Sequence, residues 1–549
     1  MDKKWILLIL LIASLLRLYG LNQGDTVNDE VFTAFRAVSL VDFNEAEFQT
    51  TPWEWFDPHI PGWAKLSFHD HPPLVFWVQH FFIKIFGENN FAFRFPSAIL
   101  GILSVWLLYL LGRKMFSQKV GLLSAAVLAA TLNHVYISRV GMQESYVIFF
   151  ILLASYFFLK AVEREKYFLW TGLALGLGFL TKYTAFVLIP IFLVYLVLFN
   201  RGAFRKKFFW LGILLVTAIF SPVIIYNLKM YQAVGHFDFQ FSYVFNQPHP
   251  EWNLQPGKEI GSLAERLENF VPRTIASNSW SFLFLAGLAL LSGLILFIKE
   301  PKKSLLKYGF LAISLVFLFL LLLKIGPSYR FLTMLAPFLA LTVGIFLNFL
   351  AGKTKKYFLI PLILILGFEV FYSINNQIFY YPKGISPWFS SKVRYENYNW
   401  GYNELDKYLK QEFKGQMPAL TFEVKYRFLE ELRDKALREG LAQKLVLNPF
   451  LIVYGGNFDD GAKLWVMERR FVYHAWPVLR AEDYLRYLRE EGEDYYDRSG
   501  FSRQYFVMPA NFVPLPEINK KLAGVVPLAI KNPRGDIVFL VFKFSKEIN

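Results

Sequence analysis

The sequence predicts a polytopic α-helical membrane protein with a separate C-terminal α/β domain. Of its 549 residues, 55% are hydrophobic and only 18% are charged, and the mean hydropathy is +0.35. Soluble proteins of this length carry more charge. Apolar runs of roughly 20 residues, the length that crosses a bilayer, recur along the chain. Near residue 374 the pattern changes to charged helical stretches that alternate with strand-like runs.

The membrane region, residues 1–373, is expected to cross the bilayer about eleven times. The first run follows Lys3 and Lys4 and has no small-residue cleavage site, so we interpret it as a retained helix. Arg17, near the far end of that helix, is expected to reach the membrane surface. The spans are expected near residues 5–21, 92–112, 120–137, 146–161, 168–181, 183–199, 208–226, 279–298, 306–325, 329–350 and 356–373.

Loop charge orients these spans. Basic clusters such as RKMFSQK, EREK, RGAFRKK, KEPKKSLLK and AGKTKK recur in alternate connectors, on the same side as Lys3 and Lys4. The positive-inside rule makes that side cytoplasmic. Everything after Tyr372 then faces outward. We expect a multi-pass protein of the cytoplasmic (inner) membrane, with the α/β domain, residues 374–549, on the outer (periplasmic) side.

Two outer loops are unusually long, and loops of such length are usually functional or disordered. The first, residues 22–91, contains ten acids and only three Lys or Arg residues. Its apolar stretch after Pro73 is too short to span, so a helix along the membrane surface is expected. The second, residues 227–278, is rich in Pro, Asn, Gln and aromatic residues and contains a predicted amphipathic helix at SLAERLENF.

Composition also excludes several classes of function. The chain has no cysteine, which rules out disulfides, thiolate catalysis and Cys-based metal sites. Its net charge of +15 comes from short tracts between apolar runs, which indicates topology and argues against nucleic-acid binding. A transporter or lipid flippase stays open as an alternative, but would show charged helices at mid-membrane and two related halves. A sensor or scaffold that binds a partner through the outer domain is a third alternative.

The polar residues that could carry chemistry lie in the predicted outer connectors. Asn28-Asp29-Glu30 follows the first helix, and the alternative interpretation is ordinary solvated acids. Glu144 begins the fourth span, where a helix dipole also favours an acid. Lys182 and Arg330 are lone cations at outer turns, suited to an anionic ligand or to interfacial snorkelling. The segment His69-Asp70-His71-Pro72-Pro73 sets polar ligands against a rigid turn.

A divalent metal stays open, with Asp70, His69 and His71 as candidate ligands, although their spacing is not diagnostic. Ordinary interfacial histidines are the alternative.

The order of motifs resembles the GT-C membrane glycosyltransferases. RLYG closes the first helix and is followed by Asp29-Glu30, DHPPLVFW, RFPSAILGILSVWLLYLLGRKMF, SRVGMQESYVIFF, GLALGLGFLTKYTAFVLIP and YRFLTMLAPFLAL. The resemblance covers the membrane region and points to the branch that holds the protein O-mannosyltransferases, the lipid A aminoarabinose transferases and the lipopolysaccharide galacturonosyltransferases. The C-terminal domain shows no comparable match.

This resemblance implies a GT-C fold and a lipid-phosphate sugar donor whose polyprenyl tail lies in the bilayer, with transfer at the outer face. Asp29 aligns with the acid considered catalytic in the family, and Glu30 with its partner. The position before the prolines is Lys in many lipid A enzymes and His in the protein mannosyltransferases. Here it is His71, so substrate choice cannot be carried over from one branch.

Phosphate chemistry supports the same assignment. The phosphate leaving group needs charge stabilisation and no general acid, so one base for the acceptor hydroxyl suffices. We therefore expect Asp29 as general base, supported by Glu30, Asp70 and Glu144, with Lys182, Arg330 and His71 at the donor phosphate. Lipid A, lipopolysaccharide or another envelope glycan is the expected acceptor, and a protein hydroxyl is the alternative. The C-terminal domain is expected to help select the acceptor.

Overall fold

The computed structural model describes residues 2–26, 29–43, 49–252, 261–393, 400–455 and 458–545. The chain forms two compact units. The first contains Met1–Asn22, Ala46–Thr51 and Pro61–Tyr395. The second contains Gln23–Glu45, Pro52–Ile60 and Glu396–Asn549. The predicted first outer loop therefore contributes to both units, and parts of it fold together with the C-terminal residues.

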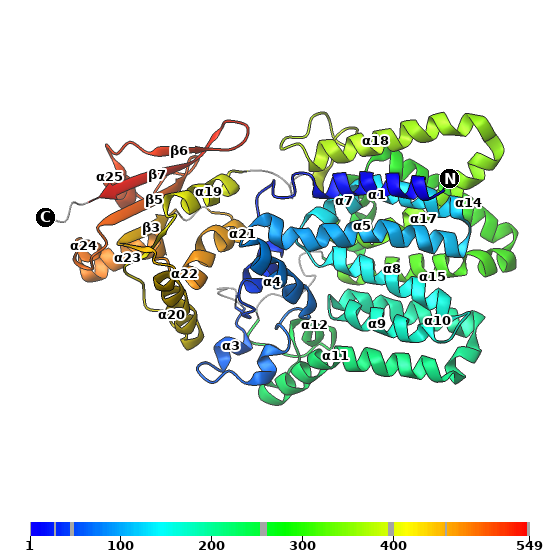
Figure 1. Ribbon diagram of the computed structural model, residues 1–549, viewed down its shortest axis with the longest axis horizontal. Coiled ribbons are helices and arrows are strands. Elements are labelled where there is room, and N and C mark those ends of the chain that lie inside the picture. The colour runs from blue at the N-terminus through cyan, green and yellow to red at the C-terminus, as the bar shows by residue number, and fades with distance from the viewer. Residues whose placement is uncertain are drawn as a thin grey trace. The chain divides into compact units, whose positions relative to one another are not determined.

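The first unit is a bundle of helices (Figure 1). Each of the eleven predicted apolar runs coincides with one helix or with two or three consecutive helices. The long helices are α1 (Asp2–Leu18), α5 (Asn90–Met115), α6 (Gln118–Ala130), α7 (Leu132–Arg139), α8 (Glu144–Ala161), α9 (Tyr167–Phe179), α10 (Leu188–Phe199), α11 (Lys207–Val234), α14 (Trp280–Lys299), α15 (Pro301–Ile325), α17 (Ala336–Thr354) and α18 (Leu359–Gln377). Shorter elements join them: η1 (Gly62–Lys65), α4 (Leu74–Phe86), η2 (Tyr183–Val187), η3 (Arg201–Arg205), α12 (Phe239–Val244), α13 (Leu263–Ser277), α16 (Tyr329–Leu332), η5 (Thr333–Leu335) and η6 (Lys355–Phe358).

Seven helices in the described part of the chain are long and apolar enough to cross a membrane, or eight if the bent pair α6 and α7 forms one span. Helices α4, α9 and the pair η2–α10 are apolar but shorter. A membrane protein is thus supported, while the number of eleven crossings stays a prediction. Both loop helices expected from the sequence are present, as α4 and α13, and α13 begins with a capping box between Ser262 and Glu265.

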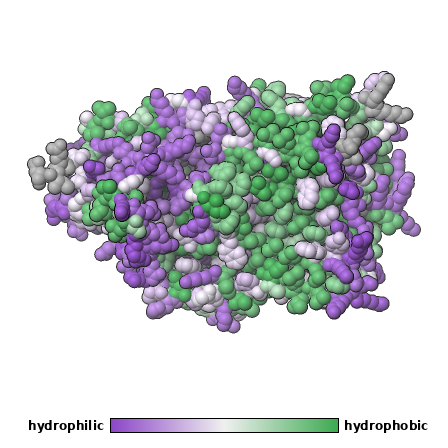
Figure 2. Space-filling view, viewed as in Figure 1, coloured by the Kyte–Doolittle hydropathy of each residue, from purple (hydrophilic) through white to green (hydrophobic). Residues whose placement is uncertain are grey.

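The outer surface of the first unit is apolar, as a bilayer requires. Figure 2 shows hydrophobic residues spread over this unit, whereas hydrophilic residues dominate the surface of the second. Trp106, half-way along α5, is 42% exposed, and α14 exposes Leu291, Leu294 and Ile298. Exposed apolar area of this extent is rare on soluble monomers, and lipid is the solvent that suits it.

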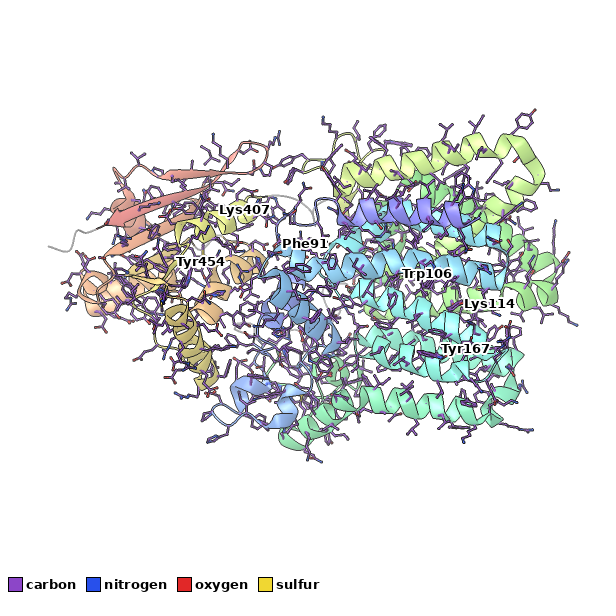
Figure 3. The ribbon with its side chains drawn as sticks, viewed as in Figure 1. Phe91, Trp106, Lys114, Tyr167, Lys407 and Tyr454 are labelled. Carbon is purple, nitrogen blue, oxygen red and sulfur yellow. The ribbon has the colours of Figure 1, made fainter. Side chains whose placement is uncertain are left out.

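Three of the predicted basic connectors, RKMFSQK, EREK and RGAFRKK, lie together in the first unit. Phe91 and Lys114 mark the two ends of α5 in Figure 3, and Tyr167 lies at the same end as Lys114. Lys114 forms an ion pair with Glu163, which belongs to the next basic connector. Lys206 lies 3.7 Å from Glu165. These ion pairs place three of the five basic connectors on one face of the first unit, as the alternation of loop charge predicts.

Arg17 corrects one expectation. Its guanidinium does not reach the membrane surface: it is fully buried, and donates hydrogen bonds to the carbonyl oxygens of Ala129 (3.0 Å) and Leu128 (3.3 Å) and to His134 Nδ1 (2.7 Å). These carbonyls end α6, which bends by 61° into α7. A broken helix leaves its last carbonyls without intrahelical partners, and in lipid they must be satisfied internally. Arg17 lies inside the bundle because its guanidinium supplies the hydrogen bonds that these carbonyls need.

The second unit is an α/β fold around a five-stranded sheet of order β4-β3-β5-β7-β6. Strands β3, β4 and β5 are parallel, whereas β7 is antiparallel to β5 and β6. Side chains of β3 alternate between two apolar cores, one containing Ile452 and the other Val453, so both faces of the sheet are covered. The strands are β1 (Gln416–Pro418), β2 (Val446–Asn448), β3 (Phe450–Tyr454), β4 (Val478–Arg480), β5 (Arg503–Pro509), β6 (Leu528–Lys531) and β7 (Ile537–Ser545).

Two of the helices in this unit, α2 (Asp29–Ala37) and α3 (Pro52–Trp55), come from the predicted first outer loop. The others are α19 (Tyr402–Glu412), α20 (Arg427–Ala442), α21 (Asp460–Lys463), the π-helical turn η8 (Leu464–Glu468), α22 (Arg469–His474), α23 (Ala481–Glu491), α24 (Tyr495–Arg498) and α25 (Pro516–Leu522).

Candidate active site

Asp29 and Glu30 form the first turn of α2 in the second unit. Acids are stabilised at this end of a helix by the helix dipole. Their environments differ, since Asp29 is exposed whereas Glu30 is fully buried. Asn28, which precedes them, lies outside the described residues. The exposed carboxylate is the one that a substrate could reach.

Glu144, Lys182 and Arg330 come together in the first unit. Lys182 Nζ donates a hydrogen bond of 2.7 Å to Glu144 Oε1, and Arg330 Nε lies 3.9 Å from the same oxygen. The Glu144 side chain is 2% exposed, that of Lys182 13% and that of Arg330 27%. Both cations also lie against the ring of Phe331, at 4.9 Å and 4.8 Å from its centroid. Two cations thus lie at one carboxylate, and guanidinium and ammonium groups are the side chains that contact anionic ligands such as phosphates.

The segment from His69 to His71 forms a second polar group in the same unit. Asp70 Oδ2 lies 3.1 Å from His71 Nδ1, and Asp70 Oδ1 lies 4.0 Å from His69 Nδ1. The backbone is fixed by hydrogen bonds from Phe239 N to His69 O (2.8 Å) and from Phe68 N to His71 O (3.3 Å). Asp70 therefore lies beside both imidazoles.

A metal does not fit this group well. Within the described residues, no three or more His, Asp or Glu side chains are arranged so that they could hold a metal ion. No step of the reaction is therefore assigned to a metal.

Asp238 is an acid that sequence reasoning missed. It is fully buried, accepts hydrogen bonds from Asn227 Nδ2 (3.0 Å) and from the Tyr183 hydroxyl, and caps α12 through Phe241 N (2.9 Å). Burial raises the pKa of Asp238, and the charge of Asp70 adds to this rise. The sequence held one signal that could have identified Asp238, because an aspartate directly before a helical stretch is a common N-cap.

Hydrogen bonds link the segments that carry these residues. Leu74 N, at the start of α4, donates to Leu180 O (3.0 Å), two residues before Lys182. Tyr183, one residue after Lys182, binds Asp238. The first unit thus gathers the predicted residues Asp70, His71 and Lys182 on segments that contact one another. Glu144 is bound to Lys182, and Arg330 lies 3.9 Å from the same Glu144 oxygen.

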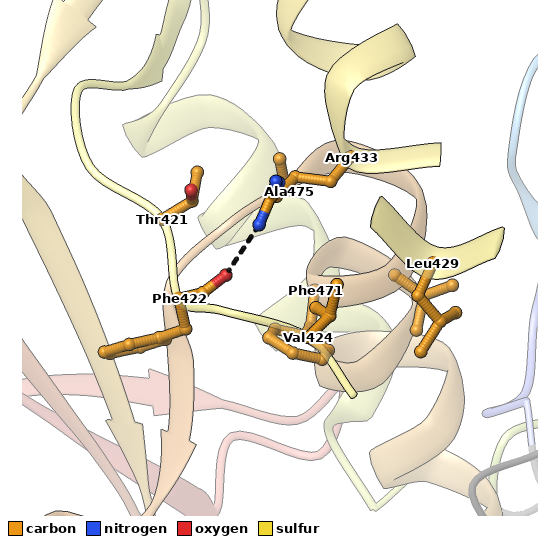
Figure 4. Close-up of a pocket in the computed structure, with 8 residues that line it drawn as sticks. Thr421, Phe422, Val424, Leu429, Arg433, Phe471 and Ala475 are labelled. Carbon is orange, nitrogen blue, oxygen red and sulfur yellow. Dashed lines mark hydrogen bonds between the residues drawn. The ribbon is translucent and has the colours of Figure 1, made fainter. Parts of the chain in front are cut away.

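A pocket in the second unit does not resemble a substrate site. It is lined by Thr421, Phe422, Val424, Leu429, Arg433, Phe471, Val472 and Ala475 and has a volume of about 10 Å³, room for about one water molecule (Figure 4). Its one charged group, Arg433, donates to Phe422 O (3.4 Å) and pairs with Glu430 and Asp434. Ligand pockets are usually larger and present polar groups that converge on the ligand.

The fold has known relatives. The crystal structure of ArnT from Cupriavidus metallidurans bound to undecaprenyl phosphate superposes with a TM-score of 0.56 and 14% sequence identity, covering 99% of this chain and 98% of that one. The chain shares the fold of that structure. Residues 70–226 match the family described as dolichyl-phosphate-mannose-protein mannosyltransferase, and both findings agree with the resemblance predicted from the sequence.

Curated relatives match parts of this chain. "Putative mannosyltransferase YycA" of Bacillus subtilis is 32% identical over 217 residues, which are 39% of this chain and 30% of the relative. An undecaprenyl phosphate-alpha-4-amino-4-deoxy-L-arabinose arabinosyl transferase of Pseudomonas aeruginosa is 32% identical over 145 residues, 25% of this chain and 26% of the relative. The match to the family includes Asp70, His71, Glu144 and Lys182 and excludes Asp29 and Arg330.

Proposed function

We propose that this protein transfers a sugar from a polyprenyl-phosphate donor to an acceptor hydroxyl at the outer face of the cytoplasmic membrane. The observation that carries the proposal is the group of Glu144, Lys182 and Arg330, in which two cations able to contact a phosphate lie at one carboxylate. The group belongs to an apolar helical unit, as a lipid-linked donor requires. ArnT from Cupriavidus metallidurans, which shares the fold, binds undecaprenyl phosphate in its crystal structure, and this supports the same donor class.

In the proposed reaction Asp29 is the general base. Its carboxylate removes the proton of the acceptor hydroxyl while the hydroxyl oxygen attacks the anomeric carbon of the sugar. The bond between that carbon and the phosphate oxygen breaks, and the configuration inverts. Polyprenyl phosphate leaves with the electron pair, and Lys182 and Arg330 stabilise its added charge, with His71 as a further contact. Glu30, Asp70 and Glu144 orient these groups.

The acceptor we favour is lipid A, lipopolysaccharide or another envelope glycan. The relatives named as arabinosyl transferases support a pentose donor, and the family description supports mannose and a protein acceptor. A protein O-glycosyltransferase is therefore the second candidate. The position of Asp70 beside His71 does not distinguish a glycan acceptor from a protein acceptor, because Asp70 can orient a hydroxyl of either.

The test combines the purified protein with polyprenyl-phosphate pentoses and hexoses and with lipid A, other envelope glycans or Ser/Thr peptides. Mass spectrometry follows the mass of each acceptor. We expect transfer to a glycan or glycolipid, and a loss of about 10²- to 10⁴-fold in kcat for Asp29→Asn with donor binding retained. Full activity of Asp29→Asn would remove the proposed base. Transfer to peptides alone would establish the second candidate.

A further inference from the structure

Asp25, which belongs to the predicted first outer loop, caps α19, a helix of the C-terminal sequence. It is fully buried, and its Oδ2 accepts hydrogen bonds from Gly401 N (3.1 Å) and from Trp400 N, while Oδ1 accepts one from Asn403 N (2.8 Å). These amides open α19, whose own N-cap residue, Gly401, offers no side chain. The first N–H groups of a helix have no intrahelical partner, and a carboxylate is a strong acceptor for them. Asn403 Nδ2 returns a bond to Gly24 O (2.8 Å).

Helix α2, which starts four residues after Asp25, also rests on the C-terminal sequence. It packs against α21 and the π-helical turn η8. Its apolar face is fully buried, and the ring of Phe35 lies 5.1 Å from that of Tyr473. Nine residues are too few for a helix that is stable alone in water. The helical state of α2, and with it the direction of Asp29, therefore depends on this packing.

A second acid of the first loop makes the same kind of contact elsewhere. Asp57 accepts hydrogen bonds from Arg427 N (2.7 Å) and Phe428 N (3.1 Å) at the start of α20. The N-cap residue of α20, Tyr426, provides no side-chain cap either. Phe43 and Trp53 contact the ring of Phe428, at 5.6 Å and 5.7 Å. Two of the ten acids in this loop thus serve as helix caps for the C-terminal sequence.

We propose that the C-terminal α/β domain is a positioning element of the transfer reaction, with Asp25 as the positioning residue that fixes α2 and so orients Asp29. This rests on the assignment of Asp29 as general base. It gives the domain a role in catalytic rate, beyond the selection of an acceptor. Asp57 anchors the later part of the loop and does not hold α2 directly.

The two aspartates make a matched pair for the test. Asp25→Asn and Asp57→Asn each replace a carboxylate cap by an isosteric amide, and only the first adjoins α2. Hydrogen exchange of the full-length protein in detergent measures the protection of residues 29–37, and initial rates give kcat and the KM for the polyprenyl-phosphate sugar. We expect Asp25→Asn to exchange faster in α2 and to lose about 10- to 100-fold in kcat, with the donor KM within about twofold of wild type.

Asp57→Asn is expected to exchange faster at the start of α20, with α2 protection and kcat within about twofold of wild type. Equal losses of kcat in both variants would overturn the inference, because they would indicate general destabilisation. Unchanged α2 protection and kcat in Asp25→Asn would also overturn it. A wrong base is distinguishable from wrong positioning, since the first is shown by an active Asp29→Asn and the second by an active Asp25→Asn.

Discussion

Lys182 donates a hydrogen bond of 2.7 Å to Glu144 Oε1, and this pair is nearly buried in the helical unit. A lysine held in this way is already oriented and partly desolvated before any ligand arrives, so a phosphate would meet it at little further cost in side-chain entropy. Glu144 also lies 3.9 Å from Arg330 Nε, so one carboxylate orients both cations that we propose as phosphate contacts.

Lys182→Gln is expected to weaken the binding of polyprenyl phosphate by about 10- to 100-fold, the value of a hydrogen bond to a charged group. Titration of the purified variant with polyprenyl phosphate measures the Kd. Because the group is mostly buried, the loss should change little between low and high salt. Lys84→Gln, an exposed lysine on α4, is the matched control and should bind as wild type. An unchanged Kd for Lys182→Gln would remove Lys182 from the donor site.

Arg17→Met is expected to lower the melting temperature of the protein in detergent. The change leaves the carbonyls of Leu128 and Ala129 without their donor where α6 breaks, and each buried orphan costs about 1–3 kcal/mol. Lys4→Met, at an exposed position of the same helix, is the control and should melt as wild type. Equal melting temperatures for the two variants would mean that water or another group forms hydrogen bonds with the carbonyls at the break between α6 and α7.

Close contact between α5 and α6 gives a third prediction. A Cβ at Gly121 would lie 2.5 Å from Tyr109 O and 2.9 Å from Arg113 N, so Gly121→Ala should separate the helices and destabilise the protein by about 1–3 kcal/mol. At Gly287, an exposed position of α14, a Cβ meets nothing within 4 Å. Gly287→Ala should therefore leave the melting temperature unchanged or slightly raised. The melting temperatures of both variants check this prediction. A Gly121→Ala variant as stable as wild type would contradict close packing between α5 and α6.

The helices were predictable because a bilayer imposes a length and a composition on every span. The pairing of Lys182 with Glu144 was only partly predictable, because the sequence placed both at outer helix ends without saying that they touch. The hydrogen-bond partners of Arg17 and Asp25 could not be predicted from the sequence, for a physical reason. Their partners are backbone groups distant in sequence, at Ala129 and Trp400, and backbone groups leave no residue-type signal.

Asp25→Asn provides a prediction that depends on pH. Burial raises the pKa of Asp25 from 3.8 to about 7, with the nearby Glu404 adding to the rise, although the N–H donors of α19 oppose it. A carboxyl whose pKa is higher in the folded state stabilises that state fully below pH 3.8, and this stabilisation is lost as the pH rises through about 7.

The melting temperature of wild type should therefore exceed that of Asp25→Asn by more at pH 5.5 than at pH 8.5, because the asparagine does not titrate. Melting curves of both proteins across this range, in one detergent and at constant ionic strength, measure the difference. A gap that widens with rising pH would mean that the ionised carboxylate is the stable form. In that case the amides of Trp400, Gly401 and Asn403, aided by the dipole of α19, would outweigh the cost of burying the charge.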